Sequence, residues 1–228
     1  RSLAPDGGLF IPKQIKKFSS NELKKMKRLN YIDLATEVVS SFCVPTLNKQ
    51  QLKALIKKSY KKFKKKDVVS LIELDKINLL ELYHGPTLAF KDIAMQCISN
   101  IYEEFNNNNK DITNIVVATS GDTGAAAISA LSKRKKINLF VLHPHNKISK
   151  VQKKIMTTIG GSNIYNIAIR GSFDDCQKIV KQMFADNIFR QTVNMSGVNS
   201  INWARIIFQI VYYFYSFLRL NKKKLNYA

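Results

Sequence analysis

The sequence predicts a protein of the α/β class with a small helical domain at its N-terminus. Residues 1–66 combine a proline- and glycine-rich opening with helical patterns, whereas from Val68 onward short β-branched runs alternate with amphipathic segments. This alternation is typical of a parallel sheet covered by helices. With 228 residues and 45% hydrophobic content, the chain can form a sizeable core. We therefore predict an N-terminal domain over residues 1–76 and an α/β domain over residues 77–228.

Three helices are expected in the N-terminal domain. Each follows a residue that caps helices well, namely Ser19 or Ser20, then Asn30, then Asn48. The pattern after Asn48 continues through the lysine-rich stretch at residues 57–66, where apolar residues recur at helical spacing. These lysines are therefore expected on the solvated face of an amphipathic helix.

From Val68 onward, five strands and five helices are expected, mostly in alternation. We predict that the first two strands open the parallel unit. The last helix is apolar around most of its circumference, so we expect it to be buried on nearly all sides. The predicted strands span residues 68–74, 79–83, 112–118, 137–142 and 163–169, and the helices span residues 90–105, 124–131, 149–159, 173–184 and 203–220, with a turn at residues 106–109.

The net charge of +21, from 37 Lys and Arg against 16 Asp and Glu, is the balance expected of a nucleic-acid-binding protein. However, the excess is mostly lysine and accompanies many asparagines and isoleucines, all of which have A/T-rich codons. A biased genome would produce the same excess without any function. We predict no nucleic-acid partner, while a basic nucleic-acid-binding protein built on a decayed enzyme scaffold stays open as an alternative.

Several other classes of protein are disfavoured by particular residues. The three cysteines are far apart, which indicates neither a disulfide framework nor a zinc site and favours a cytoplasmic location. The apolar run at residues 206–218 is shorter than the roughly 20 residues of a membrane span, so no membrane partner is expected. His143 and His145 lack a third ligand at suitable spacing, so no metal site is expected.

Residues 119–124, with the sequence Thr-Ser-Gly-Asp-Thr-Gly, directly follow a predicted strand and open a predicted helix rich in alanine. Backbone amides in such a loop can converge on an anion at the positive end of the helix dipole. A plain tight turn would have the same pattern, so this motif needs a second one to indicate a site.

The second motif surrounds Lys91. Residues 80–87 lead from a predicted strand through a Gly-Pro turn, and Lys91 follows at the start of a helix. The positive end of the helix dipole disfavours an ammonium there, and amine chemistry requires a lysine that is neutral part of the time. An isolated lysine at such a position would more often be a surface residue.

Residues 81–92 (ELYHGPTLAFKD) and 118–126 (ATSGDTGAA) together closely resemble the two signature blocks of threonine synthases, at matching spacing. Further resemblance follows in the same order along nearly the whole chain, at residues 6–12, 147–152, 171–176 and 199–205. The resemblance implies the fold type II architecture of pyridoxal-phosphate enzymes, as in the β subunit of tryptophan synthase. It also implies conversion of O-phospho-L-homoserine and water to L-threonine and phosphate.

The resemblance assigns roles around the cofactor, pyridoxal 5'-phosphate. Lys91 corresponds to the lysine that carries the cofactor and moves protons at the substrate carbons. Phe90 would pack beside the cofactor. Asp122 occupies a position where relatives of this fold place an asparagine against the cofactor ring.

The resemblance also assigns the substrate contacts. The substrate carboxylate would be held by the loop residues Ser120, Gly121, Thr123 and Gly124. The substrate phosphate would be held by Asn199, Ser200 and Arg205, and a guanidinium suits a phosphate dianion because it can bind two oxygens at once.

The family pattern continues with a glycine-rich loop for the cofactor phosphate and a residue facing the pyridine nitrogen, neither of which occurs in the 228 residues. We therefore expect the chain to be the first part of a longer enzyme and to be inactive alone. The expected protein is a monomer or homodimer. A threonine-synthase-like phospholyase, which shares both blocks and releases a keto acid, stays open as an alternative.

Overall fold

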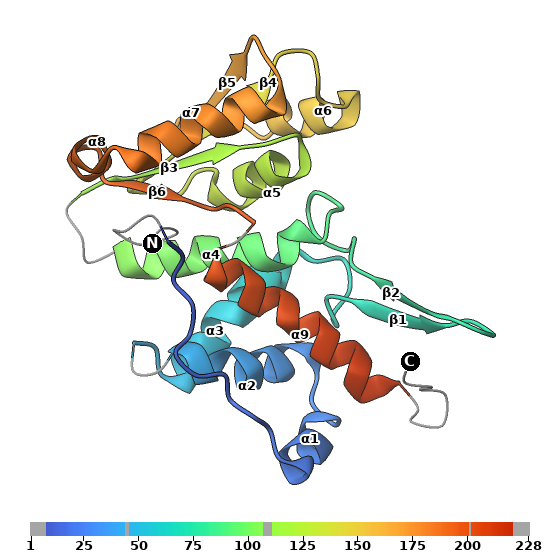
Figure 1. Ribbon diagram of the computed structural model, residues 1–228. Coiled ribbons are helices and arrows are strands. Elements are labelled where there is room, and N and C mark those ends of the chain that lie inside the picture. Colours follow the sequence, from blue (N-terminus) through green and yellow to red (C-terminus); the bar gives the residue numbers. More distant parts are fainter. Residues whose placement is uncertain (1–7, 44–45, 107–110, 201, 221–228) are drawn as a thin grey trace.

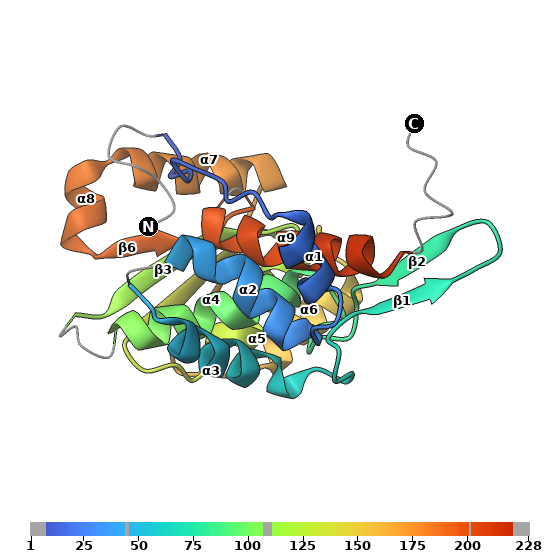
Figure 2. The same cartoon turned by 90° about the horizontal axis from the view of Figure 1, so that it is seen from below.

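The computed structural model of the protein describes residues 8–43, 46–106, 111–200 and 202–220. It has two adjoining parts (Figure 1). One is a four-stranded sheet with helices against it, and the other is a group of helices from which a two-stranded hairpin projects. Seen from below, α4 (Lys91–Asn106) and α9 (Trp203–Arg219) of the helical group lie in front of the sheet (Figure 2).

The first three helices are α1 (Ser20–Met26), α2 (Tyr31–Cys43) and α3 (Lys49–Ser59), as predicted. Their predicted caps are confirmed, because Ser19, Asn30 and Asn48 each accept a hydrogen bond from the backbone amide three residues later. In α3 the apolar side chains at residues 52, 55 and 56 are buried and the lysines at residues 57 and 58 are exposed. The α-helix ends earlier than expected and continues as the 3-10 helix η1 (Tyr60–Lys62).

The first two predicted strands exist but do not open the parallel unit. β1 (Ser70–Glu73) and β2 (Asn78–Glu81) pair with each other in antiparallel register and form a separate hairpin. Only four residues separate them, which allows a hairpin but not the crossover that parallel neighbours need. The predicted domain boundary, between residues 76 and 77, falls in the turn of this hairpin and stays a prediction.

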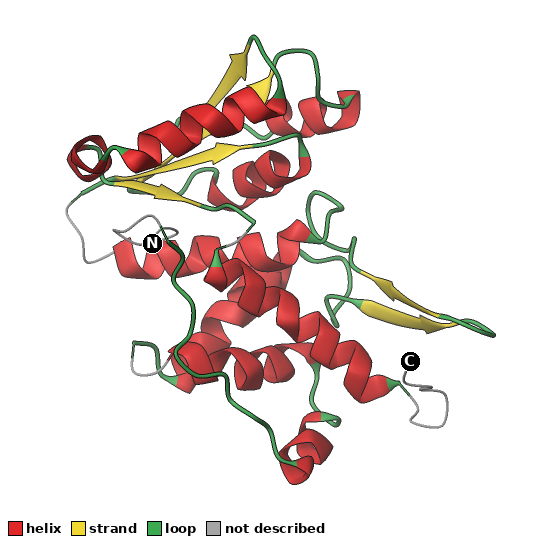
Figure 3. Ribbon diagram, viewed as in Figure 1, coloured by secondary structure: helices red, strands yellow, loops and turns green. Residues whose placement is uncertain are grey.

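The larger sheet is parallel, in the order β5-β4-β3-β6. Its strands alternate with helices along the chain, as predicted, and the strand and helix layers are distinguished by colour in Figure 3. The strands are β3 (Thr113–Ala118), β4 (Ile137–Pro144), β5 (Ile164–Ile169) and β6 (Met195–Gly197), and the helices are α5 (Asp122–Leu131), α6 (Lys150–Thr158), α7 (Phe173–Ala185) and α8 (Asn187–Thr192). The sequence did not indicate β6 and α8, which have only three and six residues.

The two faces of the sheet are covered by different helices. Successive side chains of a strand point to opposite faces. Ile115 and Val117 of β3 accordingly belong to the large hydrophobic cluster with α5, while Val116 lies in a smaller cluster with Cys176 and Phe184 of α7. Because neighbouring side chains of β3 point to opposite faces, α5 and α7 cover opposite faces of the sheet.

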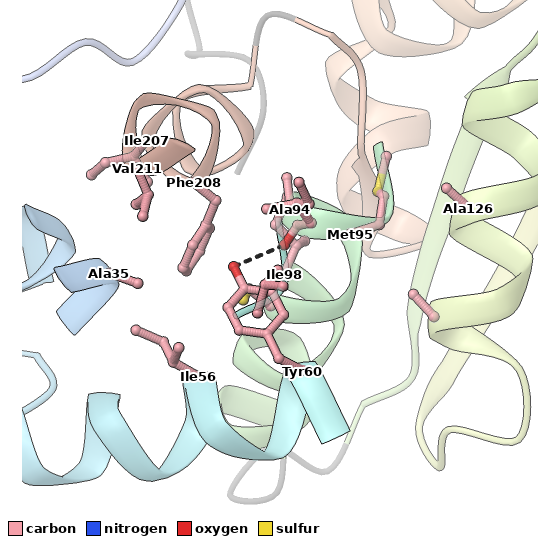
Figure 4. Packing of buried hydrophobic residues seen from close by; sticks show 14 of the residues in the cluster. Ala35, Ile56, Tyr60, Ala94, Met95, Ile98, Ala126, Ile207, Phe208 and Val211 are labelled. Carbon is pink, nitrogen blue, oxygen red and sulfur yellow. Dashed lines mark hydrogen bonds between the residues drawn. The ribbon is translucent and has the colours of Figure 1, made fainter. Parts of the chain in front are cut away.

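The main core lies where α4 (Lys91–Asn106) and α9 (Trp203–Arg219) pack against each other and against the N-terminal helices. In Figure 4, Phe208 of α9 and Ile98 of α4 face Ile56 of α3. The Tyr60 hydroxyl donates a hydrogen bond of 3.2 Å to the Ile93 carbonyl in this core. The core is thus shared by both parts of the molecule.

The last helix, α9, was predicted to be buried on nearly all sides, and only two of its residues are exposed. One side of α9 packs into the core, but Tyr213 is 63% exposed and Phe217 is 46% exposed. The turn predicted at residues 106–109 lies largely outside the described residues. All three cysteines are free thiols. Within the described ranges, none of the helices combines the length and apolar character needed to cross a membrane, and no three potential metal ligands converge.

Candidate active site

The candidate site lies at the carboxyl edge of the parallel sheet. The chain runs from β3 to β4 and β5 on one side, and β6 then returns to the other side of β3. Ligands of open α/β sheets bind at such a switch in strand order, beside the carboxyl ends of the strands. The register pairs residue 116 with residue 197, so extending it by two residues brings Asn199 opposite Ala118. The topology therefore directs the loop after β3 and the segment after β6 to the same edge.

Lys91 is the first residue of α4, and its side chain is only 17% exposed. Its amine lies 3.1 Å from Asp122 Oδ2, at the start of α5, and 4.5 Å from the centre of the Phe90 ring. Three residues that the sequence singled out are thus brought together around one amine. The cation is held by a carboxylate on one side and an aromatic face on the other.

Asp122 has two partners, one on each carboxylate oxygen. Lys91 donates to Oδ2, and the side-chain amide of Gln152, in α6, donates to Oδ1. Burial would raise the pKa of Asp122, but the hydrogen bonds from Gln152 and Lys91 and the charge of Lys91 outweigh it and hold the pKa below its ordinary value. Asp122 is therefore an anion at neutral pH.

The turn that delivers Lys91 to the site is built around the buried carboxylate of Asp92. Thr87 donates to it twice, from its backbone amide and its hydroxyl, each at 2.7 Å. A Cβ atom at Gly85 would lie 2.5 Å from the Asp92 side chain, so only glycine fits there. Burial raises the pKa of Asp92, and the Thr87 hydrogen bonds partly oppose this. The Gly-Pro turn and the start of α4 are thus locked together.

The loop after β3 is organised by Thr119, a residue that the sequence did not single out. Its hydroxyl accepts hydrogen bonds from the amides of Gly121, at 2.9 Å, and Gly124, at 2.8 Å. Two of the amides expected to converge on an anion therefore have an acceptor within the chain. Ser120 is exposed and Thr123 is half-buried. A hydroxyl directly before a glycine loop was the available signal for Thr119.

The segment after β6 carries buried polar groups that lack partners among the described residues. Arg205 is 2% exposed, and its Nε and Nη1 atoms make no hydrogen bond there. Asn199 Oδ1 and the indole nitrogen of Trp203 are likewise buried without a partner, and Ser200 is exposed. Burial lowers the pKa of Arg205, but a guanidinium stays charged at neutral pH. This segment therefore has unused capacity to bind an anion.

The lysine and arginine groups are not joined directly. Lys91 begins α4 and Arg205 lies in the first turn of α9, and these two helices pack together. Among the described residues, no hydrogen bond or ion pair connects Asn199, Ser200 or Arg205 with Lys91 or Asp122. The structure thus brings Phe90, Lys91 and Asp122 into contact and leaves the predicted phosphate ligands as a separate group.

A cavity of about 560 Å³ is lined in part by Phe90 and Asp122, the two side chains that contact the Lys91 amine. Its volume is in the range of pockets for small molecules. Most of the side chains that line it are apolar, and they include Phe90 and Val151. The polar lining residues include Tyr83, Asp122, Ser149 and Gln152.

Comparisons with known proteins identify the class to which this fold and site belong. Residues 71–226 match the family model of pyridoxal-phosphate-dependent enzymes, and residues 1–60 match the model of the threonine synthase N terminus. Because the first of these covers more than half of the chain, the protein belongs to the family of pyridoxal-phosphate-dependent enzymes.

Within that family, the chain is similar to threonine synthases along almost its whole length. It is 43% identical to threonine synthase of Pseudomonas aeruginosa over 219 residues and 40% identical to that of Saccharomyces cerevisiae over 240 residues. The crystal structure of pyridoxal-phosphate-bound threonine synthase from Brucella melitensis superimposes with a TM-score of 0.88 at 39% identity, covering 98% of this chain and 48% of that chain. The yeast enzyme superimposes with a TM-score of 0.85.

These matches cover 96% to 98% of this chain but only 46% to 47% of the two curated relatives. The chain thus spans about half the length of the relatives it matches. The fold type II architecture is confirmed for the half that is present.

Pyridoxal 5'-phosphate is the cofactor of this family, and this chain has a lysine and an aromatic ring that suit it. A lysine must reach the cofactor to hold it, and the mostly covered Lys91 amine contacts Asp122, which lines a cavity of suitable size. The Phe90 ring supplies an apolar surface at the same place.

Proposed function

We propose that the full-length protein is a threonine synthase, which converts O-phospho-L-homoserine and water to L-threonine and phosphate. The observation that carries this proposal is the Lys91 amine, held by Asp122, whose side chain lines the cavity at the carboxyl edge of the sheet. Similarity to threonine synthases on both sides of Lys91 supports the same reaction.

Lys91 is proposed to hold pyridoxal phosphate and, once released by the substrate amine, to carry protons at the reacting carbons. When bound, the cofactor supplies an electron sink that acidifies the carbon atoms near the substrate amine. Asp122 keeps the lysine amine at one place, which is necessary because a proton transfer requires hydrogen-bond distance. Phe90 limits the position of the amine from the other side.

The substrate ends are proposed to bind on either side of Lys91. Ser120 and Thr123 offer hydroxyl groups to the carboxylate, on a loop whose shape Gly121 and Gly124 maintain. Arg205, with Asn199 and Ser200, offers donors to the phosphate group, which leaves from the γ carbon before water adds at the β carbon. Contacts to phosphate would discriminate phosphohomoserine from homoserine, because an unfilled buried guanidinium costs free energy.

Product analysis tests this function. The full-length protein, supplied with pyridoxal phosphate and O-phospho-L-homoserine, is expected to form threonine and phosphate in equal amounts, and to leave homoserine unchanged. Formation of 2-oxobutyrate without threonine would contradict the proposal and identify a phospholyase. Steeply salt-dependent binding of a nucleic acid, without turnover, would instead support the basic-protein alternative.

We also propose a cytoplasmic location, which the three free thiols support. The proposed partners are small-molecule substrates, and the proposed assembly is a monomer or homodimer. Sedimentation of the full-length protein measures the assembly directly.

A further inference from the structure

The side chain of Gln152 departs from the local role that its position in α6 favours. α6 begins with the pattern Ser-x-x-Gln, which normally forms a capping box, with the glutamine bonded back to the amide of the cap residue. Gln51 does this at the equivalent position of α3, where it accepts from the Asn48 amide at 3.1 Å. Gln152 instead reaches across to Asp122 of α5.

Gln152 is held in this orientation by Ser149. The Ser149 hydroxyl donates to Gln152 Oε1 at 2.9 Å and accepts from the Gln152 backbone amide at 3.2 Å. Because Oε1 is occupied as an acceptor, the NH₂ group of the side chain must face Asp122. The hydrogen-bond network thus defines which end of the amide faces Asp122.

The loop before α5 leaves space for Gln152. Gly121 has a φ of 143°, a conformation that side chains disfavour, and a Cβ atom there would overlap the Gln152 amide. The glycine therefore allows the Gln152 side chain to lie against the loop backbone. Gln152 also lines the same cavity as Phe90 and Asp122.

We propose that Gln152 is a positioning residue, which orients the Asp122 carboxylate so that its Oδ2 atom faces the Lys91 amine. A carboxylate with one partner can rotate, whereas donors on both oxygens define its plane. The hydrogen bonds then run from Ser149 through Gln152 and Asp122 to Lys91, across three helices. The inference rests on the proposed role of Lys91 in holding the cofactor and deepens it.

Gln152→Met in the full-length protein tests the proposal, because methionine keeps the length of the side chain and removes the donor. We expect kcat to fall about tenfold, the effect of one charge-assisted hydrogen bond, with KM changed less than about twofold. The pH midpoint of the visible absorption of the lysine-bound cofactor is expected to move by about one unit. Gln51→Met, which removes a glutamine from the same position of α3, should leave kcat and the pH midpoint unchanged.

Gln152→Glu supplies a signature that a structural role would not produce. At neutral pH the introduced carboxylate repels Asp122, whereas at lower pH it takes up a proton and can donate as the amide does. The activity of this variant relative to the unaltered protein should therefore rise as the pH falls. The relative activity of Gln152→Met should stay constant.

A double-mutant cycle with Asp122→Asn decides whether Gln152 acts through Asp122. The double variant should shift the absorption midpoint no further than Asp122→Asn alone. Additive shifts, or a larger drop in the melting temperature of the cofactor-free protein for Gln152→Met than for Gln51→Met, would overturn the proposal. These readouts do not depend on the reaction product, so formation of 2-oxobutyrate would contradict the proposed function without affecting this inference.

Discussion

Two groups of polar residues at the sheet edge differ in how they are satisfied. In the lysine cluster, formed by Lys91, Asp122, Gln152 and Ser149, hydrogen bonds within the chain link each residue to the next. In the arginine segment, residues 199–205, buried atoms of three described side chains have no partner among the described residues.

The difference shows which half of the site is already organised without a ligand. A buried unpaired polar group costs roughly 1–3 kcal/mol, so the arginine segment gains free energy from any group that completes it. The lysine cluster has no such deficit, and its geometry is defined before a ligand arrives. We infer that the first group positions the chemistry and the second binds an anion.

The largest effect is expected from Lys91→Ala, which removes the amine that the lysine cluster positions. The visible absorption band of the bound cofactor should disappear, and kcat should fall by about a thousandfold or more. Lys150→Ala is a matched control, because Lys150 is also the first residue of a helix but is exposed. If the band survived Lys91→Ala, another lysine would hold the cofactor.

A smaller effect is expected from Arg205→Met. Losing a charged donor to the substrate phosphate should lower kcat/KM about a hundredfold. The free energy of unfolding without ligand should fall by less than about 1 kcal/mol or rise, because a buried unpaired charge is replaced by an apolar side chain. Steady-state kinetics and urea denaturation measure the two quantities.

Arg219, at the other end of α9, is the control for that variant. It donates to the Leu29 carbonyl at 2.8 Å and stacks on the Tyr215 ring, so Arg219→Met should destabilise the protein and leave kcat/KM unchanged. The reverse pattern, with Arg205→Met the more destabilising of the two, would show that Arg205 has a structural role.

The smallest effect concerns the pH dependence of stability. The pKa of Asp122 is lower in the folded protein than in the unfolded chain, so its ionised form stabilises the fold above pH ~4 and this contribution is lost as the pH falls through the folded pKa. Asp122→Asn should therefore lower the free energy of unfolding at pH 7, and the difference from the unaltered protein should shrink as the pH falls below the ordinary pKa of an aspartate. The difference should be under about 1 kcal/mol, because the Asp122 side chain is 45% exposed. A difference independent of pH would rule out this ion pair as the cause.

Features of the fold that depend on near neighbours were predictable. Ser19, Asn48 and Ser172 begin helices because each side chain accepts from an amide three residues later. Lys91 was predicted at a helix start from the turn residues before it, and the structure places it there. The pairing of β1 with β2 was missed, although the short connection between them was a usable signal.

The motifs of the chain were sufficient to indicate its family and the candidate lysine, and its capping residues marked several of its helix starts. The hydrogen bonds from that lysine to Asp122 and from Gln152 to Asp122 were not accessible in the same way, because Asp122 is 31 residues from Lys91 and Gln152 is 30 residues from Asp122. Such contacts depend on strand order and helix packing, which bring distant segments together. The same packing buries Arg205 and leaves two of its nitrogen atoms without a partner among the described residues, whereas the sequence indicated only that Arg205 would hold a phosphate. Local hydrogen bonding and periodicity therefore account for the elements, and the long-range packing of α4, α5, α6 and α9 accounts for the site.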